Sequence, residues 1–249
     1  MMKHWKLGLC GVVAYTLFLV ILTPASWWLK MLPLPPAVQL GQVTGTLWQG
    51  EVKQLSFQQQ PLPALAWRLN PWSLLTLRPE IALSSGTLQQ VNAPYLQSTL
   101  QVRIGGLQLK ESLVRLPVTT LLPYLTLPLP VQARGELVVE IQQLRLAELQ
   151  CEELIGQASW LNASLQPPTG TWLDLKNIYA SLSCAAGQPV LITDPENVLS
   201  LAIEATMSST GALRVQGSLL PDPSLPDEVH QAMRFVGQPD ANGRFLLNF

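Results

Sequence analysis

Charged residues are scarce in this chain of 249 residues, at 12% of the sequence, against about 25% in a typical soluble domain. Lys3, Lys6 and Lys30 lie near the N-terminus, and the rest of the chain carries 12 basic and 16 acidic side chains, a net charge of −4. A domain with this balance offers no basic surface to a phosphate backbone. We therefore expect no nucleic-acid partner.

Residue types that enzymes use are also rare. There are two histidines, His4 and His230, and no Walker, G-x-G-x-x-G, HExxH or C-x-x-C motif. His230 falls on an expected short helix and no serine motif accompanies it, so we interpret it as a surface histidine. The carboxylates of Glu152, Glu153, Asp194 and Glu196 are interpreted as solvated edges or turns rather than as glycosidase acids. The sequence predicts no enzymatic activity, no cofactor and no metal site.

A long uncharged run begins at Leu7 and continues, with apolar character, to Leu29. It contains 23 residues, and about 20 are enough to cross a bilayer. Lys3 and Lys6 precede it, and the positive-inside rule keeps such an N-terminus in the cytoplasm. We therefore expect residues 1–6 in the cytoplasm, a transmembrane helix over residues 7–29 and export of the remaining chain.

A cleaved signal peptide is the alternative interpretation of this run, with Thr23 and Ala25 as a poor small-residue cleavage site. We favour an uncleaved anchor because Trp27, Trp28 and Lys30 are typical of a membrane interface. The proline-rich residues 30–37 predict a stiff extended linker. Residues 38–249 are then the exported domain.

Alternation of apolar and polar residues dominates the exported part and predicts an all-β fold, an antiparallel and hairpin-rich curved sheet. The clearest hairpin joins strands over 199–208 and 213–219. Another joins Leu100–Ile104 to Leu107–Leu109 through a turn at Gly105–Gly106. Leu137, Val139 and Ile141 share a face, and a bulge near Gln142–Gln143 would bring Leu144 and Leu146 back onto it. Further strands are expected at 51–58, 63–70, 79–91, 154–166, 171–183, 188–193 and 243–249.

Prolines recur throughout and leave little room for long helices. One short helix is expected near residues 225–236, where Ser224 and Asp227 resemble a capping box and Gly237 ends the helical period. A further turn or two of helix is expected over residues 118–125.

Cysteine is used three times, at Cys10, Cys151 and Cys184. Cys10 lies in the uncharged run, so the exported part holds an even number of thiols in an oxidising compartment. We predict a disulfide between Cys151 and Cys184, the alternative being two buried unpaired thiols. In the chain-entropy model such a bond adds roughly 3 to 4 kcal/mol to stability.

Two stretches, GTLWQG at 45–50 and LAWRLNPWSLL at 65–75, follow the anchor and the linker. In this order they resemble the type II secretion system protein N family, with Gly45, Trp48, Gly50, Trp67 and Pro71 as the marker residues. The resemblance implies an inner-membrane component of the machinery that exports folded proteins across the outer membrane. It also implies a periplasmic domain, no catalytic residues, and partners among the inner-membrane platform and secretin-associated proteins.

The layout is also similar to that of periplasmic proteins that build an apolar β-groove for lipids. This similarity implies a second function, the binding of lipid or of another apolar ligand. The apolar richness of the strands is equally typical of a simple sheet core.

The stretch GQVTGTLWQGEV at 41–52 is consistent with either a ligand-binding loop or a strand. A phosphate-binding loop leads into a helix, but here an extended pattern continues toward Phe57. We predict a strand with a tight turn near Gln49–Gly50, whose glycines leave bare backbone for an aromatic ring. Trp48 is expected to pack beside Trp67 or Trp72.

Overall fold

The computed structural model describes residues 11–12, 15, 18–19, 21–29, 38–57, 60–90, 93–122, 131–148, 150–167, 170–208, 212–225, 229–231, 233 and 237–248. The chain divides into two compact units, Met1–Gly86 and Thr87–Phe249, which we call the N-terminal unit and the C-terminal unit. The expected linker over 30–37 lies outside the described residues, and the expected transmembrane segment is described only in part. Within the described residues, no helix has the length and apolar character needed to span a bilayer.

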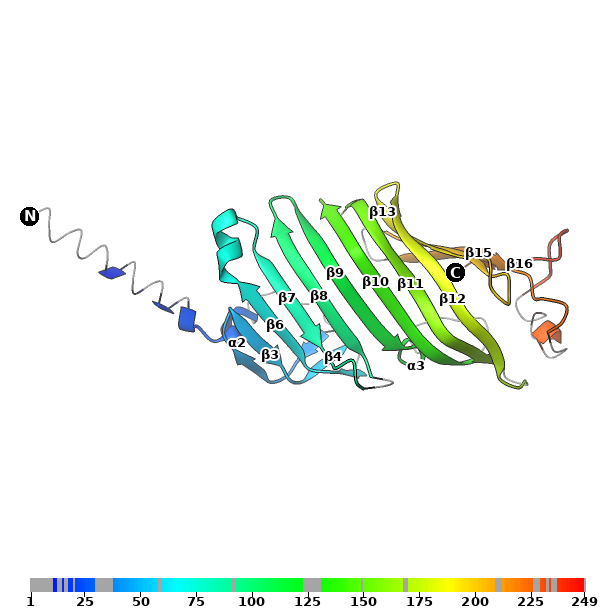
Figure 1. Cartoon of the computed structure of the whole chain (residues 1–249), viewed down its shortest axis with the longest axis horizontal. Helices are drawn as coiled ribbons and strands as arrows, with labels where there is room; N and C mark the ends of the chain where they lie inside the picture. The colour runs from blue at the N-terminus through cyan, green and yellow to red at the C-terminus, as the bar shows by residue number, and fades with distance from the viewer. Residues whose placement is uncertain are drawn as a thin grey trace, which may run out of the picture. The chain divides into compact units, whose positions relative to one another are not determined.

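Short antiparallel strands make up the described part of the N-terminal unit. One sheet has the order β1-β4-β5 and contains β1 (Val38–Leu40), β4 (Leu55–Phe57) and β5 (Gln60–Leu62). Another has the order β2-β3-β6-β7 and contains β2 (Val43–Gly45), β3 (Gln49–Val52), β6 (Leu65–Asn70) and β7 (Glu80–Ser85). The short helix α2 (Ala25–Leu29) precedes the strands, and the 3-10 helix η1 (Pro71–Thr76) joins β6 to β7 (cyan in Figure 1).

In the C-terminal unit each strand pairs antiparallel with the next one along the chain. The strands are β8 (Tyr95–Arg103), β9 (Gly106–Pro117), β10 (Gln132–Ala147), β11 (Gln150–Gln166), β12 (Leu173–Ala185), β13 (Gln188–Thr193), β14 (Ala202–Met207), β15 (Leu213–Leu219) and β16 (Phe245–Asn248). Figure 1 shows the long strands β8 to β12 lying side by side. The all-β, antiparallel and hairpin-rich prediction is confirmed for the described residues.

The expected bulge in β10 is present. The pairing of β10 with β11 shifts by one residue between Ile141 and Gln143, where Ile141 faces Gly156 and Gln143 faces Ile155. One extra residue in β10 restores the phase of the apolar side chains, so that Leu144 pairs with Leu154 on β11. The sheet thus keeps one apolar face along a strand of 16 residues.

The hairpin between β8 and β9 turns one residue earlier than predicted. Arg103 pairs with Gly106, so the two turn residues are Ile104 and Gly105 rather than Gly105 and Gly106. Gly105 adopts φ +83°, a left-handed conformation that glycine reaches without steric cost. As a result Ile104 does not share the apolar face with Leu100 and is 94% exposed.

The strands predicted at 188–193 and 213–219 have the bounds of β13 and β15, and other predicted strands are present with shifted ends. The prediction over 51–58 is split into β3 and β4 by a turn at Lys53–Gln54, where the Lys53 amide donates to Gln42 O over 2.9 Å. The strand expected from 199 begins at Ala202 because the Asn197 side chain binds the backbone of Leu199 and Leu201. That side chain offers the backbone partners that compete with a sheet ladder.

Both expected helical segments are found where they are described. The helix α3 (Val118–Leu121) follows β9, and residues 229–231 and 233 are helical, while the rest of 226–236 lies outside the described residues. Before this second helix the Ser224 hydroxyl and amide hydrogen-bond to the Asp222 carboxylate, and they lower the pKa of this exposed group.

The core of the C-terminal unit gathers around Ala163 and Leu175, which are almost fully buried, together with Ile178 and Leu199. Ala163 and Leu175 come from the paired strands β11 and β12, and Leu199 comes from the segment before β14. Burial of these apolar side chains is the main favourable contribution to the stability of the unit.

A disulfide joins Cys151 on β11 to Cys184 on β12, with a Cα–Cα distance of 5.6 Å. The pairing of these two strands extends in this direction to Gly156 and Leu182. The disulfide therefore holds the strands together beyond the end of their ladder, and Cys151 is buried there.

We predict that replacing both cysteines by serine lowers the free energy of unfolding by roughly 3 to 4 kcal/mol, because the bond closes a loop with a sequence separation of 33 residues. Chemical denaturation of the purified protein measures this change. Mass spectrometry with and without reductant provides the control, since alkylation of both thiols in the unreduced wild type would contradict the assignment.

Candidate functional site in the N-terminal unit

Two of the side chains considered for catalysis, those of Glu153 and Asp194, form ordinary structural contacts. Glu153 forms an ion pair with Arg145 at 3.0 Å, and the Asp194 carboxylate accepts a hydrogen bond from the Glu196 amide at 2.9 Å. His230 is exposed. Among the described residues no group of histidine, cysteine, aspartate and glutamate side chains could hold a metal ion.

The marker stretch at 45–50 forms the hairpin between β2 and β3. Thr46 donates its amide proton to Gln49 O over 2.8 Å, so the turn lies at Leu47–Trp48 and not at Gln49–Gly50. Gly45 has φ +99°, and a Cβ added there would lie 2.5 Å from the Gly50 Cα. Only glycine fits this position, because the two strands approach each other too closely for a side chain.

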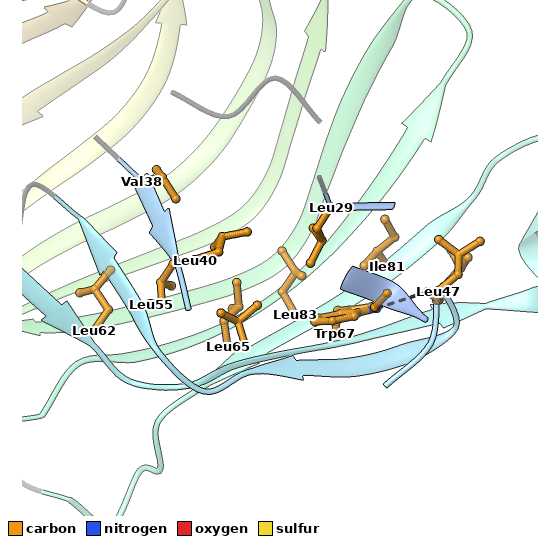
Figure 2. A pocket seen from close by; sticks show the side chains of 13 residues that line it. Leu29, Val38, Leu40, Leu47, Leu55, Leu62, Leu65, Trp67, Ile81 and Leu83 are labelled. Atoms are coloured by element: carbon orange, nitrogen blue, oxygen red, sulfur yellow. Dashed lines mark hydrogen bonds between the residues drawn. The ribbon is translucent and has the colours of Figure 1, made fainter. Parts of the chain in front are cut away.

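Gly50 provides the bare backbone on which an aromatic ring lies, and this ring is that of Trp67. A Cβ added at Gly50 would overlap the Trp67 indole and lie 2.5 Å from Thr44 O. The Trp67 Nε1 donates to Leu47 O over 3.2 Å, which ties β6 to the turn (dashed line in Figure 2). Three of the marker residues therefore pack together at this hairpin, Gly45 against Gly50 and Gly50 against Trp67.

Trp48 occupies a different place. It lines a hollow together with Asn70 and Pro71, at the point where η1 begins. The Trp48 carbonyl accepts a hydrogen bond from the Leu69 amide over 2.7 Å. Its indole Nε1 is buried without a hydrogen-bond partner among the described residues. The packing of Trp48 beside Trp67 or Trp72 stays a prediction.

An apolar pocket of about 470 Å³ lies within the N-terminal unit (Figure 2). Every lining residue is apolar: Ala25, Leu29, Val38, Leu40, Leu47, Val52, Leu55, Leu62, Leu65, Trp67, Leu69, Ile81 and Leu83. The helix α2 contributes Ala25 and Leu29, and the rest come from both sheets and the turn after β2. Because the Trp67 Nε1 is bonded to Leu47 O, the ring turns its apolar surface to this space. Such a pocket can hold hydrocarbon but offers no polar group to orient a polar ligand.

Between β6 and β7, η1 and the residue after it carry exposed apolar side chains, those of Trp72, Leu74, Leu75 and Leu77, which we call the apolar patch. The Asn70 side chain caps η1 by accepting the Trp72 amide over 3.1 Å, and Leu77 ends it in a left-handed conformation with φ 54°. The sequence pattern predicted a family marker here but no surface patch. The signal for a surface patch was a proline-initiated apolar run without strand alternation.

The chain matches the family model described as type II secretion system protein N over residues 36–248. It is 31% identical to the type II secretion system protein N of Aeromonas hydrophila, over 96% of this chain and 94% of that protein. It is 27% identical to that of Vibrio cholerae, over 92% of this chain and 90% of that protein. The corresponding Klebsiella pneumoniae protein is 27% identical over 98% and 94%. No solved structure matches the chain.

We predict that Trp67→Ala lowers the free energy of unfolding by about 2 to 4 kcal/mol, because it removes a half-buried ring and its bond to Leu47 O. Trp72→Ala is the matched control. The Trp72 side chain is 76% exposed, so its loss should change the stability by less than about 0.5 kcal/mol. Denaturant unfolding measures both, and equal effects would contradict the assigned role of Trp67.

Proposed function

The chain belongs to the type II secretion system protein N family, and from this premise we propose that it is an inner-membrane-anchored protein that binds other secretion proteins through its β-sheet. It is a component of the type II secretion machinery, and this membership implies interaction with other components of the system. We assign it a structural role in the export of folded proteins, with no catalytic activity of its own.

The proposed topology follows from the sequence. Residues 1–6 lie in the cytoplasm, residues 7–29 cross the inner membrane, residues 30–37 form a linker and residues 38–249 form the periplasmic domain. The uncharged run and the lysines before it support this arrangement. The disulfide between Cys151 and Cys184 is consistent with an oxidising compartment for the domain.

The observation that carries the proposal is the open edge at β16. This strand pairs with β15 on one side, and on its other side no strand among the described residues pairs with it. Its sequence, FLLN, contains no charge and no proline, the features with which proteins usually protect a sheet edge. Leu247 is buried, whereas Leu246 is 61% exposed. An edge of this kind can accept a strand from another protein, with backbone hydrogen bonds supplying affinity.

We predict that the photo-crosslinking residue p-benzoylphenylalanine at Leu246, in secreting cells, forms adducts with other type II secretion proteins. Ile192 on β13 is the matched control, because it is 47% exposed but already pairs on both sides, with Ser181 on β12 and with Glu204 on β14. Mass spectrometry identifies the partners. Adducts at Leu246 should exceed those at Ile192 severalfold, and equal yields at the two positions would contradict docking at this edge.

A second candidate function, the binding of a phospholipid acyl chain, is favoured by the pocket in the N-terminal unit. Its lining is entirely apolar, and α2, at the end of the proposed transmembrane segment, forms part of it. Apolar cavities of this kind exclude water and take up hydrocarbon. An acyl chain is the apolar ligand that a membrane-anchored protein meets at the highest concentration.

We predict that Leu83→Phe, which places a larger side chain in the pocket, lowers labelling of the N-terminal unit by a phospholipid with a photoreactive acyl chain severalfold. The full-length protein in vesicles is used, and mass spectrometry maps the labelled peptides. Leu182→Phe, a comparable change on β12 of the C-terminal unit, is the control. Labelling that Leu83→Phe leaves unchanged would exclude the pocket as the lipid site.

A further inference from the structure

We propose that the segment Pro71–Arg78, which we call the η1 loop, inserts its apolar side chains into the periplasmic surface of the inner membrane. The proposal rests on the anchoring proposed above and adds a second point of contact between the protein and the bilayer. It assigns the exposed apolar patch to a lipid surface rather than to a protein partner.

The η1 loop presents an unusual amount of apolar surface to solvent. Trp72, Leu75 and Leu77 are 76%, 77% and 72% exposed, and Leu74 is 39% exposed. Single exposed apolar residues are common, but several of them gathered in one short loop mark a binding surface. Tryptophan with leucine is the combination that membrane interfaces favour.

The hydroxyl groups and two amides of the loop are hydrogen-bonded within the protein, which lowers the cost of moving them into an apolar medium. The Ser73 hydroxyl donates to Asn70 O and accepts from the Glu80 amide, at 2.5 and 2.9 Å. The Thr76 hydroxyl donates to Ser73 O at 2.8 Å. The amides of Leu77 and Arg78 donate to Leu74 O and Ser73 O. Because unpaired backbone and hydroxyl groups are costly in hydrocarbon, this internal bonding prepares the loop for a bilayer.

The loop also lies at the end of the sheet where the chain enters the N-terminal unit. Pro24, next to α2, bridges to Thr46 in the turn between β2 and β3. The same turn contains Trp48, whose carbonyl accepts the Leu69 amide one residue before the η1 cap at Asn70. The proposed transmembrane segment and the η1 loop therefore meet the same end of this sheet. Trp27 on α2 is 53% exposed.

Charge at this end favours an anionic lipid surface. Arg68 and Arg78 are exposed on either side of η1. No acidic residue occurs in the sequence between Glu51 and Glu80, and Glu80 is half-buried. Basic residues near a membrane surface are attracted to anionic head groups, so the loop combines an apolar tip with a basic rim.

The test places a nitroxide spin label at Leu75→Cys in the full-length protein, in phosphatidylethanolamine–phosphatidylglycerol vesicles. Cys10→Ser removes the free thiol of the proposed transmembrane segment, and the disulfide occupies Cys151 and Cys184. Accessibility of the label to oxygen, which concentrates in lipid, is compared with accessibility to a water-soluble nickel chelate. Trp72→Cys provides a second label position should the first variant fold poorly.

Two further label positions, outside the η1 loop, serve as controls. Ile104→Cys labels an apolar side chain that is 94% exposed in a turn of the C-terminal unit. Gln54→Cys labels the turn at the opposite end of the N-terminal sheet, next to the Val43–Val52 pair. For the η1 loop we expect the ratio of oxygen to nickel accessibility to exceed that of both controls severalfold.

A label at Leu75 with the same ratio as the controls would overturn the proposal, since the loop would then lie in water. Low accessibility to both reagents would overturn it as well, because the loop would be covered by protein. Alkaline carbonate extraction separates this result from failure of the anchor. If the protein resists carbonate extraction but the η1 loop is exposed to water, the membrane anchor is supported and the loop contact is contradicted. If carbonate releases the protein although the label is exposed to lipid in untreated vesicles, the loop contact is supported and the membrane anchor is contradicted.

Discussion

The backbone hydrogen-bond ladder between consecutive antiparallel strands is the constraint on which the rest of this structure depends. Each strand of the C-terminal unit pairs with its sequence neighbours, and the long strands β10 and β11 keep their apolar side chains in phase only because the ladder accepts a bulge after Ile141. The same ladder leaves the outer side of β16 unpaired among the described residues. An open sheet thus builds a core with few charges and also supplies the unsatisfied backbone edge by which it can bind a partner.

Side-chain alternation made most of this ladder predictable from the sequence, including the bulge that brings Leu144 back into phase. The disulfide between Cys151 and Cys184 was predictable for another reason, the even number of thiols in an oxidising compartment. The strand ends were less predictable, because single residues determine them. Gly105, with its positive φ, places the turn one residue earlier than predicted, and the Asn197 side chain binds the backbone of Leu201, so that β14 begins only at Ala202. Strands of three residues, such as β1 and β5, are too short to show a period. The apolar pocket was not predictable either, since its lining comes together from α2 and strands of both sheets.

The N-terminal unit concentrates the family's marker residues at one end of its sheet. Gly45 permits the close hairpin, Gly50 accepts the Trp67 ring, and Pro71 begins η1. The bare backbone of the glycines was predictable from the sequence, whereas the close approach at Gly45 and the identity of the ring on Gly50 are visible only in the structure. The Trp67 ring makes two contacts: it lies against the Gly50 backbone, and it also lines the apolar pocket. A single hairpin therefore shapes the pocket and positions the exposed η1 side chains that we assign to the membrane surface.

The central claim is that the open edge at β16 docks another secretion protein, and hydrogen exchange tests it most directly. Amide exchange would be followed by mass spectrometry in inner-membrane vesicles from cells that contain or lack the other type II secretion proteins. We predict that the β16 amides exchange severalfold more slowly when the partners are present, whereas the amides of β12 and β13, which are paired on both sides, exchange at the same rate in both preparations. Identical exchange of β16 in the two preparations would contradict it.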